Sequence, residues 1–175
     1  VLVGKRIGYD GTLSGTLKAR GDLKAPGTKG YAAQAHLRIA PGNNGVPGSG
    51  HIDADYRGAS GLVDLGQSAV VLPHSRLDLS GSLNHQLNVT LTSHNLNDFL
   101  PAANFEATKP QSSLPISLQN GTAHIQAQVN GTLTAPRITG NVSLTNFAVE
   151  QRAFDRFSLD LAASPSGATI SNGLL

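Results

Sequence analysis

The sequence predicts an all-β protein, built as a thin and mostly antiparallel sheet. Three observations support this prediction: apolar and polar residues alternate along several segments, turn-forming residues separate those segments, and similar segments recur along the chain. The composition agrees, because aromatic residues make up only 5% of the chain and Trp and Met are absent. Leu, Val, Ile and Ala must therefore fill any interior, which favours a thin sheet over a thick globule.

Alternation with period two predicts the individual strands. The clearest segment is 123–130, in which Ala, Ile, Ala and Val alternate with His, Gln, Gln and Asn. The same pattern predicts strands at residues 51–56, 76–80, 86–92, 141–144 and 158–161. Strands with one apolar and one polar face are typical of antiparallel sheets that are exposed to water on one side.

Turn signals separate these segments. Gly, Pro, Asn and Asp cluster at residues 10–11, 25–27, 41–45, 120–121, 130–131 and 165–167. One helical turn is expected at residues 97–100, closed by Pro101, and a polar loop is expected at 102–113.

A degenerate repeat is also present. Residues 21–30 (GDLKAPGTKG) and 131–140 (GTLTAPRITG) share the pattern G-x-L-x-x-P-x-x-x-G, and each is followed by an alternating stretch and a second strand. The approximate repeats span 21–81 and 131–175, with 82–130 between them. Such repeats usually build structures that grow in one direction, and we interpret residues 1–175 as a single fragment of a larger repeat protein.

These segments resemble the repeats of TamB and AsmA-like proteins. The resemblance is carried by residues 131–147 (GTLTAPRITGNVSLTNF), by 154–161 (FDRFSLDL) followed by 167–170 (GATI), and by 72–81 (LPHSRLDLSG). It implies a curved, elongated sheet, the U-shaped groove called a β-taco, whose concave side is apolar. It also implies a periplasmic location in a Gram-negative-type bacterial envelope, with the parent protein anchored in the inner membrane.

The family is linked to phospholipid transport between the inner and outer membranes, and TamB, with its partner barrel TamA, to outer-membrane protein assembly. The expected partners are therefore phospholipid acyl chains or outer-membrane protein strands, and an outer-membrane barrel similar to TamA. Exposing a sixteen-carbon acyl chain to water costs a free energy on the order of 12 kcal/mol, which an apolar groove would reduce by covering the chain. The residues expected to line it are Val89, Leu91, Ile125, Ala127, Val129, Val142, Leu144, Leu159 and Leu161.

Two alternatives remain open at this stage. The apolar strand faces could instead form the core of a closed β-sandwich, or the chain could be a β-solenoid, in either case as a binding or adhesion module of a bacterial surface protein. An enzyme is not expected, because the chain has neither a phosphate-binding loop ending in Gly-Lys-Ser/Thr nor a Gly-x-Ser-x-Gly elbow. No cofactor is expected either.

The charged residues do not predict a metal or nucleic-acid site. His51, Asp53 and Asp55 share one strand face and could hold a metal ion, but carboxylates with this spacing also occur on any solvated polar strand face, and we favour that interpretation. Charged residues make up only 14% of the chain, and 13 Lys and Arg against 11 Asp and Glu leave a net charge of +2. This scattered charge is too weak to predict nucleic-acid binding.

Overall fold

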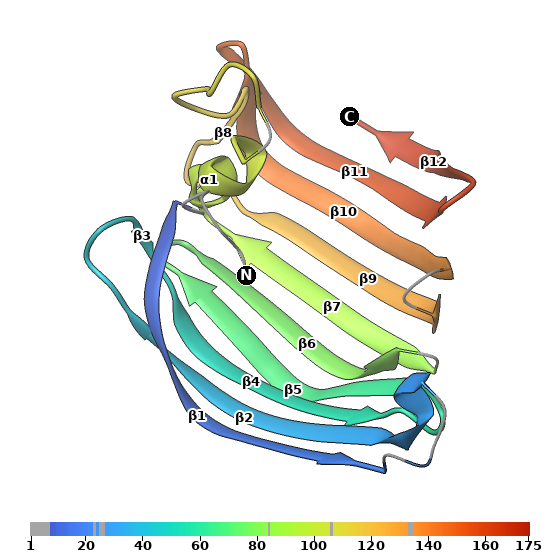
Figure 1. Ribbon diagram of the computed structural model, residues 1–175. Coiled ribbons are helices and arrows are strands. Elements are labelled where there is room, and N and C mark those ends of the chain that lie inside the picture. Colours follow the sequence, from blue (N-terminus) through green and yellow to red (C-terminus); the bar gives the residue numbers. More distant parts are fainter. Residues whose placement is uncertain (1–7, 23, 25–26, 84, 106, 133–134) are drawn as a thin grey trace.

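The computed structural model describes residues 8–22, 24, 27–83, 85–105, 107–132 and 135–175. It confirms the predicted fold class, since the described strands form one open, mostly antiparallel sheet of 12 strands (Figure 1). The strands are β1 (Tyr9–Gly21), β2 (Tyr31–Pro41), β3 (Val46–Pro47), β4 (Ser49–Arg57), β5 (Leu62–Leu72), β6 (Ser75–Leu83), β7 (Gln86–Ser93), β8 (Ile116–Leu118), β9 (Ala123–Thr132), β10 (Ala135–Val149), β11 (Arg152–Ser164) and β12 (Gly167–Leu174).

The strand order is nearly sequential. It runs β12-β11-β10-β9-β7-β6-β5-β4-β2-β1-β3, and β8 pairs with the end of β10 beyond β9. Sequential neighbours can be joined by short hairpins, and Glu150 and Gln151 between β10 and β11 both have positive φ, as a tight two-residue hairpin requires. No second sheet covers this one within the described residues, so the sandwich alternative is not found there.

The opening patterns of the two predicted repeats both lie at connections between antiparallel neighbouring strands. Residues 21–30 lie where β1 turns into β2, and residues 131–140 lie where β9 turns into β10. Leu23, Ala25, Pro26, Leu133 and Thr134 of the repeat pattern fall outside the described residues. The first pattern is followed by β2, which pairs with β4, and the second runs into β10, which pairs with β11.

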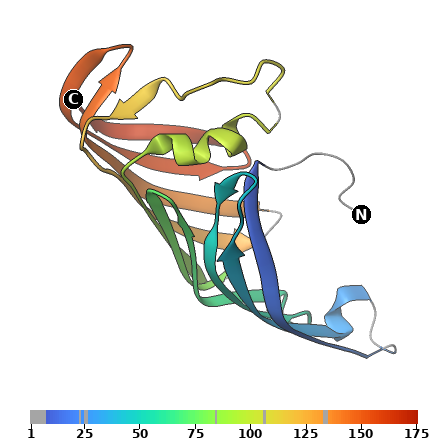
Figure 2. The same ribbon diagram turned by 90° about the vertical axis from the view of Figure 1, so that its left-hand side faces the viewer.

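The sheet is strongly curved, and a helical segment lies on its hollow side (Figure 2). That segment consists of the 3₁₀ helix η2 (Leu96–Phe99) and α1 (Leu100–Ala103); a second 3₁₀ helix, η1 (Gly27–Gly30), precedes β2. The register shifts on both sides of β5 near Gly66, whose φ is +53°. A β-bulge of this kind bends the strand that carries it.

Three local predictions were wrong. Pro101 does not close the helical turn but lies in the first turn of α1, where its missing N–H costs no hydrogen bond. Residues 10–11 do not form a turn, because β1 continues through them. Residues 130–131 lie within β9, where Gly131 adopts a φ of +88°. No helix in the described part of the chain has the length and hydropathy to cross a bilayer.

Candidate functional site

One face of the sheet is apolar across nearly all of its strands. Residues directly opposite each other on paired strands point to the same face. The pairing therefore defines a row that crosses the sheet, here called the central row. Its members are Leu13, Ile39, Gly50, Val70, Leu77, Leu91, Ile125, Val142 and Leu159.

Two neighbouring rows on this face are also apolar. One contains Leu79, Val89, Ala127, Gly140, Leu161 and Ile170. The other contains Gly81, Leu87, Val129, Ile138, Ala163 and Ala168. These three rows, here called the apolar face, include eight of the nine residues that the sequence predicts to share a surface.

Most side chains of the apolar face are in partial contact with solvent. The buried hydrophobic residues among those described are only Ala69, Leu87, Ala123, Leu144, Phe147 and Ala148, and none belongs to the central row. The eight predicted residues on the apolar face are all partly exposed. The edge strands are the most open, with Leu13 59% and Ile170 65% exposed.

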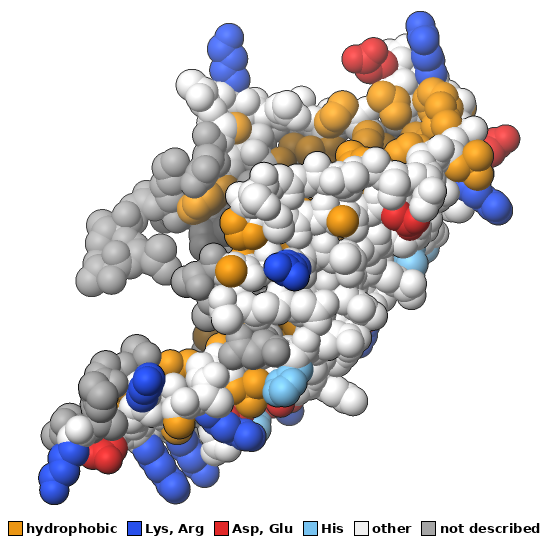
Figure 3. Space-filling view, turned by 90° about the vertical axis from the view of Figure 1, so that its right-hand side faces the viewer, with side chains coloured by type: hydrophobic (Ala, Val, Ile, Leu, Met, Phe, Trp, Pro, Cys, Tyr) orange, Lys and Arg blue, Asp and Glu red, His pale blue; other side chains and the backbone are white. Residues whose placement is uncertain are grey.

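Figure 3 shows the side of the molecule that lies on the right in Figure 1. Hydrophobic side chains gather toward the top, where β10 to β12 lie, and most Lys and Arg side chains extend from the bottom, around β1 and β2. Partly exposed aliphatic side chains arranged over many strands form a larger apolar surface than isolated exposed residues would.

Leu144 is the exception among the predicted residues. It belongs to a fourth row, here called the capped row, which contains Ser75, Ser93, Ala123, Leu144 and Phe157. Leu144 is only 7% exposed. The expectation that it lines an open surface was therefore wrong, because the segment from η2 to β8 covers this end of the sheet.

The covering segment packs on an aromatic cluster. Ala123, Leu144 and Phe147 form a buried core against which Leu96, Ile116, Leu118, Val149, Phe154 and Phe157 pack. The Phe147 ring stacks on Phe154 at 5.3 Å between centroids and meets Phe157 edge-on at 6.3 Å. Asn146 has a φ of 44°, and this left-handed residue interrupts the alternation so that Leu144 and Phe147, three residues apart, join one cluster.

A buried carboxylate ties the helical segment to the sheet. Asp98 in η2 is 5% exposed and accepts hydrogen bonds from the backbone N–H of His74 at 2.7 Å and from Ser75 Oγ at 2.8 Å. Ser75 and Ser93 Oγ lie 2.9 Å apart, and Ser93 Oγ also accepts the backbone N–H of Asn95. These hydrogen bonds of Asp98 are here called the Asp98 latch. The sequence did not reveal it, because the two partners, Ser75 and His74, are 23 and 24 residues from Asp98 in the chain.

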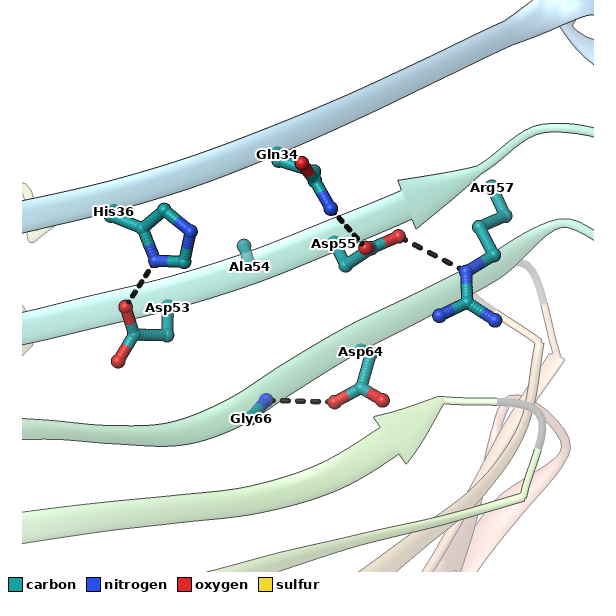
Figure 4. A pocket seen from close by; sticks show the side chains of 8 residues that line it. All are labelled: Gln34, His36, Asp53, Ala54, Asp55, Arg57, Asp64 and Gly66. Carbon is teal, nitrogen blue, oxygen red and sulfur yellow. Dashed lines mark hydrogen bonds and ion pairs between the residues drawn. The ribbon is translucent and has the colours of Figure 1, made fainter. Parts of the chain in front are cut away.

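The opposite face of the sheet is polar and carries the residues considered for a metal site. A hollow of about 260 Å³ lies there, and His36 Nδ1 in its lining is 2.7 Å from Asp53 Oδ1. Figure 4 shows the side chains that line it. Asp55 accepts hydrogen bonds from Gln34 and from Arg57. The bond from Gln34 is the main reason why the pKa of Asp55 is lowered.

These side chains do not converge on a common point. His51 Nε2 lies 2.8 Å from the backbone oxygen of Gln67, away from the partners of Asp53 and Asp55. The described residues contain no group of three or more His, Asp or Glu arranged to hold a metal ion. Each candidate ligand instead has its own cross-strand or same-strand partner, as on a solvated polar face.

A search of protein-family models, of curated proteins and of solved structures finds no match for this chain.

Proposed function

We propose that this chain is a segment of a TamB/AsmA-like envelope protein whose apolar face shields hydrocarbon from water in the periplasm. The guest would be a phospholipid acyl chain on its way between the inner and outer membranes, or a strand of an outer-membrane protein during its assembly. The parent protein would be anchored in the inner membrane and would act with an outer-membrane barrel similar to TamA. No residue is proposed to perform chemistry.

The observation that carries the proposal is the open central row. Eight aliphatic side chains and one glycine follow each other across nine paired strands, and none is buried. Water in contact with such a surface is unfavourable by about 25 cal/mol for each Å². A guest that covers the surface removes this cost for itself and for the protein, which favours binding.

The chemistry of the rows favours an acyl chain over a protein strand on this face. The central row and its two neighbours consist of aliphatic residues, Ala and Gly, whose side chains have no hydrogen-bonding groups. A protein strand needs partners for its backbone N–H and C=O groups, and only the edges of a sheet offer them. A protein client would therefore pair with an edge strand rather than lie across the apolar face.

Photocrosslinking at two adjacent residues tests the proposal. Val129 lies on the apolar face, while its neighbour Gln128 is exposed on the polar face. With a photoreactive residue at each position in turn and phospholipid vesicles as the probe, we expect lipid adducts at position 129 and not at 128. Adducts at neither position, or equally at both, would contradict the proposal.

A second variant separates transport from folding. Ile125→Asp places a charge in the middle of the central row, where it can still reach water, so the sheet should remain folded. Transfer of a labelled phospholipid by the parent protein should fall sharply. Normal transfer by a folded Ile125→Asp protein would argue against the apolar face as the route.

A further inference from the structure

The central row ends beside a hollow that the sequence did not reveal. This hollow, here called the Tyr9 pocket, has a volume of about 300 Å³ and is walled by Tyr9, Leu13, Ile39, Val70 and Leu72, with Gly48 at its side. Leu13, Ile39 and Val70 are themselves members of the central row. Between Ile39 and Val70 the row has Gly50, so no side chain of that row separates these two walls.

The lining of the Tyr9 pocket suits hydrocarbon and offers little to a charged group. Four of its walls are aliphatic and the fifth is an aromatic ring. Asp10 and Gly11 also line the pocket, but the Asp10 carboxylate already accepts the backbone N–H of Asn44 at 2.6 Å. Covering these apolar walls with hydrocarbon removes their contact with water, which favours binding of an apolar group.

The Tyr9 pocket is open partly because Gly48, which lines it, has no side chain. A Cβ at Gly48 would lie 3.8 Å from Leu72 Cδ2, which is an ordinary contact distance, and the φ of Gly48 is not in the left-handed region. The backbone therefore does not require glycine at this position, unlike at Gly50, where a Cβ would collide with the backbone oxygen of Ala69. The absence of a side chain at Gly48 keeps the pocket empty.

The helical segment lies close to the start of β1, from which Tyr9 forms one wall of the pocket. The Tyr9 side chain lies near the backbone of Ala102 in α1, and partial burial raises the pKa of Tyr9. A Cβ added to Gly8 would lie 2.7 Å from Pro101, so the start of β1 and α1 are in close contact. Figure 2 shows the same arrangement, with α1 between the C-terminal strands and the start of β1.

We propose that the Tyr9 pocket binds the methyl end of a linear hydrocarbon chain, whose other carbons lie along the central row. This inference rests on the proposed function and adds to it a fixed position for the chain end. The methyl end enters, rather than the headgroup, because the walls are mostly apolar side chains and the methyl end has no polar group that would lose its contact with water. The Tyr9 pocket thus gives the guest a direction on the sheet.

Two photoreactive fatty acids test this placement on the full chain. One is a palmitic acid with a diazirine at its terminal carbon, and the other carries the diazirine at mid-chain. After irradiation, peptide mapping by mass spectrometry should find adducts of the terminal probe at Leu13, Ile39 and Leu72. Adducts of the mid-chain probe should lie farther along the central row, at Leu77 and Leu91.

A pocket-filling variant and a matched control sharpen the test. Gly48→Val should reduce the terminal-probe adducts in the pocket about tenfold, because about two methylene groups of the guest would no longer be buried there. The adducts of the mid-chain probe should stay unchanged. Gly173→Val is the control, because a Cβ at Gly173 would have nothing within 4 Å, and it should change neither pattern. If Gly48→Val fails to fold, Leu13→Trp fills the pocket from its exposed side.

The outcomes separate the two proposals. Identical adduct patterns for the two probes, or an unchanged terminal pattern in the folded pocket-filling variant, would overturn the Tyr9 pocket and leave the proposed function standing. Adducts with neither probe would overturn both.

Discussion

The central row and the capped row belong to the same face of the sheet but differ in how much they are covered. Val142 and Leu144 lie two residues apart on β10 and point to the same side, yet Val142 in the central row is partly exposed and Leu144 in the capped row is 7% exposed. The strand pattern is continuous between them. The difference comes from η2 and β8, whose residues Leu96, Ile116 and Leu118 pack on the cluster that contains Leu144.

The comparison shows that alternation and burial are separate properties. Period-two alternation decides which side chains share a face, since successive residues of a strand point to opposite sides. Whether that face is then buried depends on a second element that packs on it. Here the second element is a short segment at one end of the sheet, held by a carboxylate and an aromatic cluster.

The largest expected effect comes from placing a charge at these two positions. Leu144→Asp buries a carboxylate without a partner and should lower the free energy of unfolding by about 4 kcal/mol or more. Val142→Asp keeps its charge in contact with water and should cost only about 1–2 kcal/mol, from lost apolar contact and strand propensity. Urea unfolding of the two variants measures the difference, and equal losses would mean that both positions are covered.

A smaller effect is expected from the latch. Asp98→Ala leaves the backbone N–H of His74 and the Ser75 hydroxyl without their acceptor, and should lower the free energy of unfolding by about 1–3 kcal/mol. Asp78→Ala is a suitable control because Asp78 forms a solvent-exposed pair with Arg76, worth less than about 1 kcal/mol. A loss at Asp98 no greater than that at Asp78 would show that the latch does not hold the covering segment.

The smallest effect concerns the open edge at β12. Hydrogen bonds from Asn172 and then from Asn141 lower the pKa of Asp160 below its ordinary value of 3.8. A depressed pKa stabilises the fold above the ordinary value, and this contribution is lost as the pH falls through the lowered value. Acidification should therefore loosen β12, where Asn172 lies, before it affects the capped row.

Amide exchange of β12 can follow this loosening from about pH 6 down to about pH 3. The Asp160→Asn variant no longer titrates at this position, so its β12 should respond less to acid. An identical acid response in the variant and the unmodified chain would assign the loosening to other groups.

Alternation in the sequence predicted six of the twelve strands, and the face that their apolar residues share, for a physical reason. In segment 123–130 each apolar residue is followed by a polar one, and this local pattern alone determines that Ile125, Ala127 and Val129 point to the same side. The prediction that the sheet is mostly antiparallel is also confirmed. Alternation in β2, with Ala33, Ala35, Leu37 and Ile39 on one side, was present in the sequence and would have extended the predicted apolar face to β1.

The covering segment and the Tyr9 pocket could not be predicted in the same way. Asp98 meets Ser75, and Tyr9 meets Ala102, only after the sheet has curved, and neither pair has a local pattern. Likewise, the burial of Leu144 depends on Leu96 and Ile116, which belong to other elements. Contacts of this kind follow from the curvature of the sheet, to which the bulge at Gly66 contributes, rather than from alternation.

Thiol labelling tests the openness of the apolar face most directly. The protein has no Cys, so single substitutions Val142→Cys, Leu144→Cys and, as an exposed control, Gln126→Cys can each be labelled with a maleimide without background. We expect the thiol at position 142 to react at a rate close to that of the control, and the thiol at 144 to react far more slowly, because it must wait for local opening. Slow labelling at both 142 and 144 would show that the central row is covered and would contradict the account.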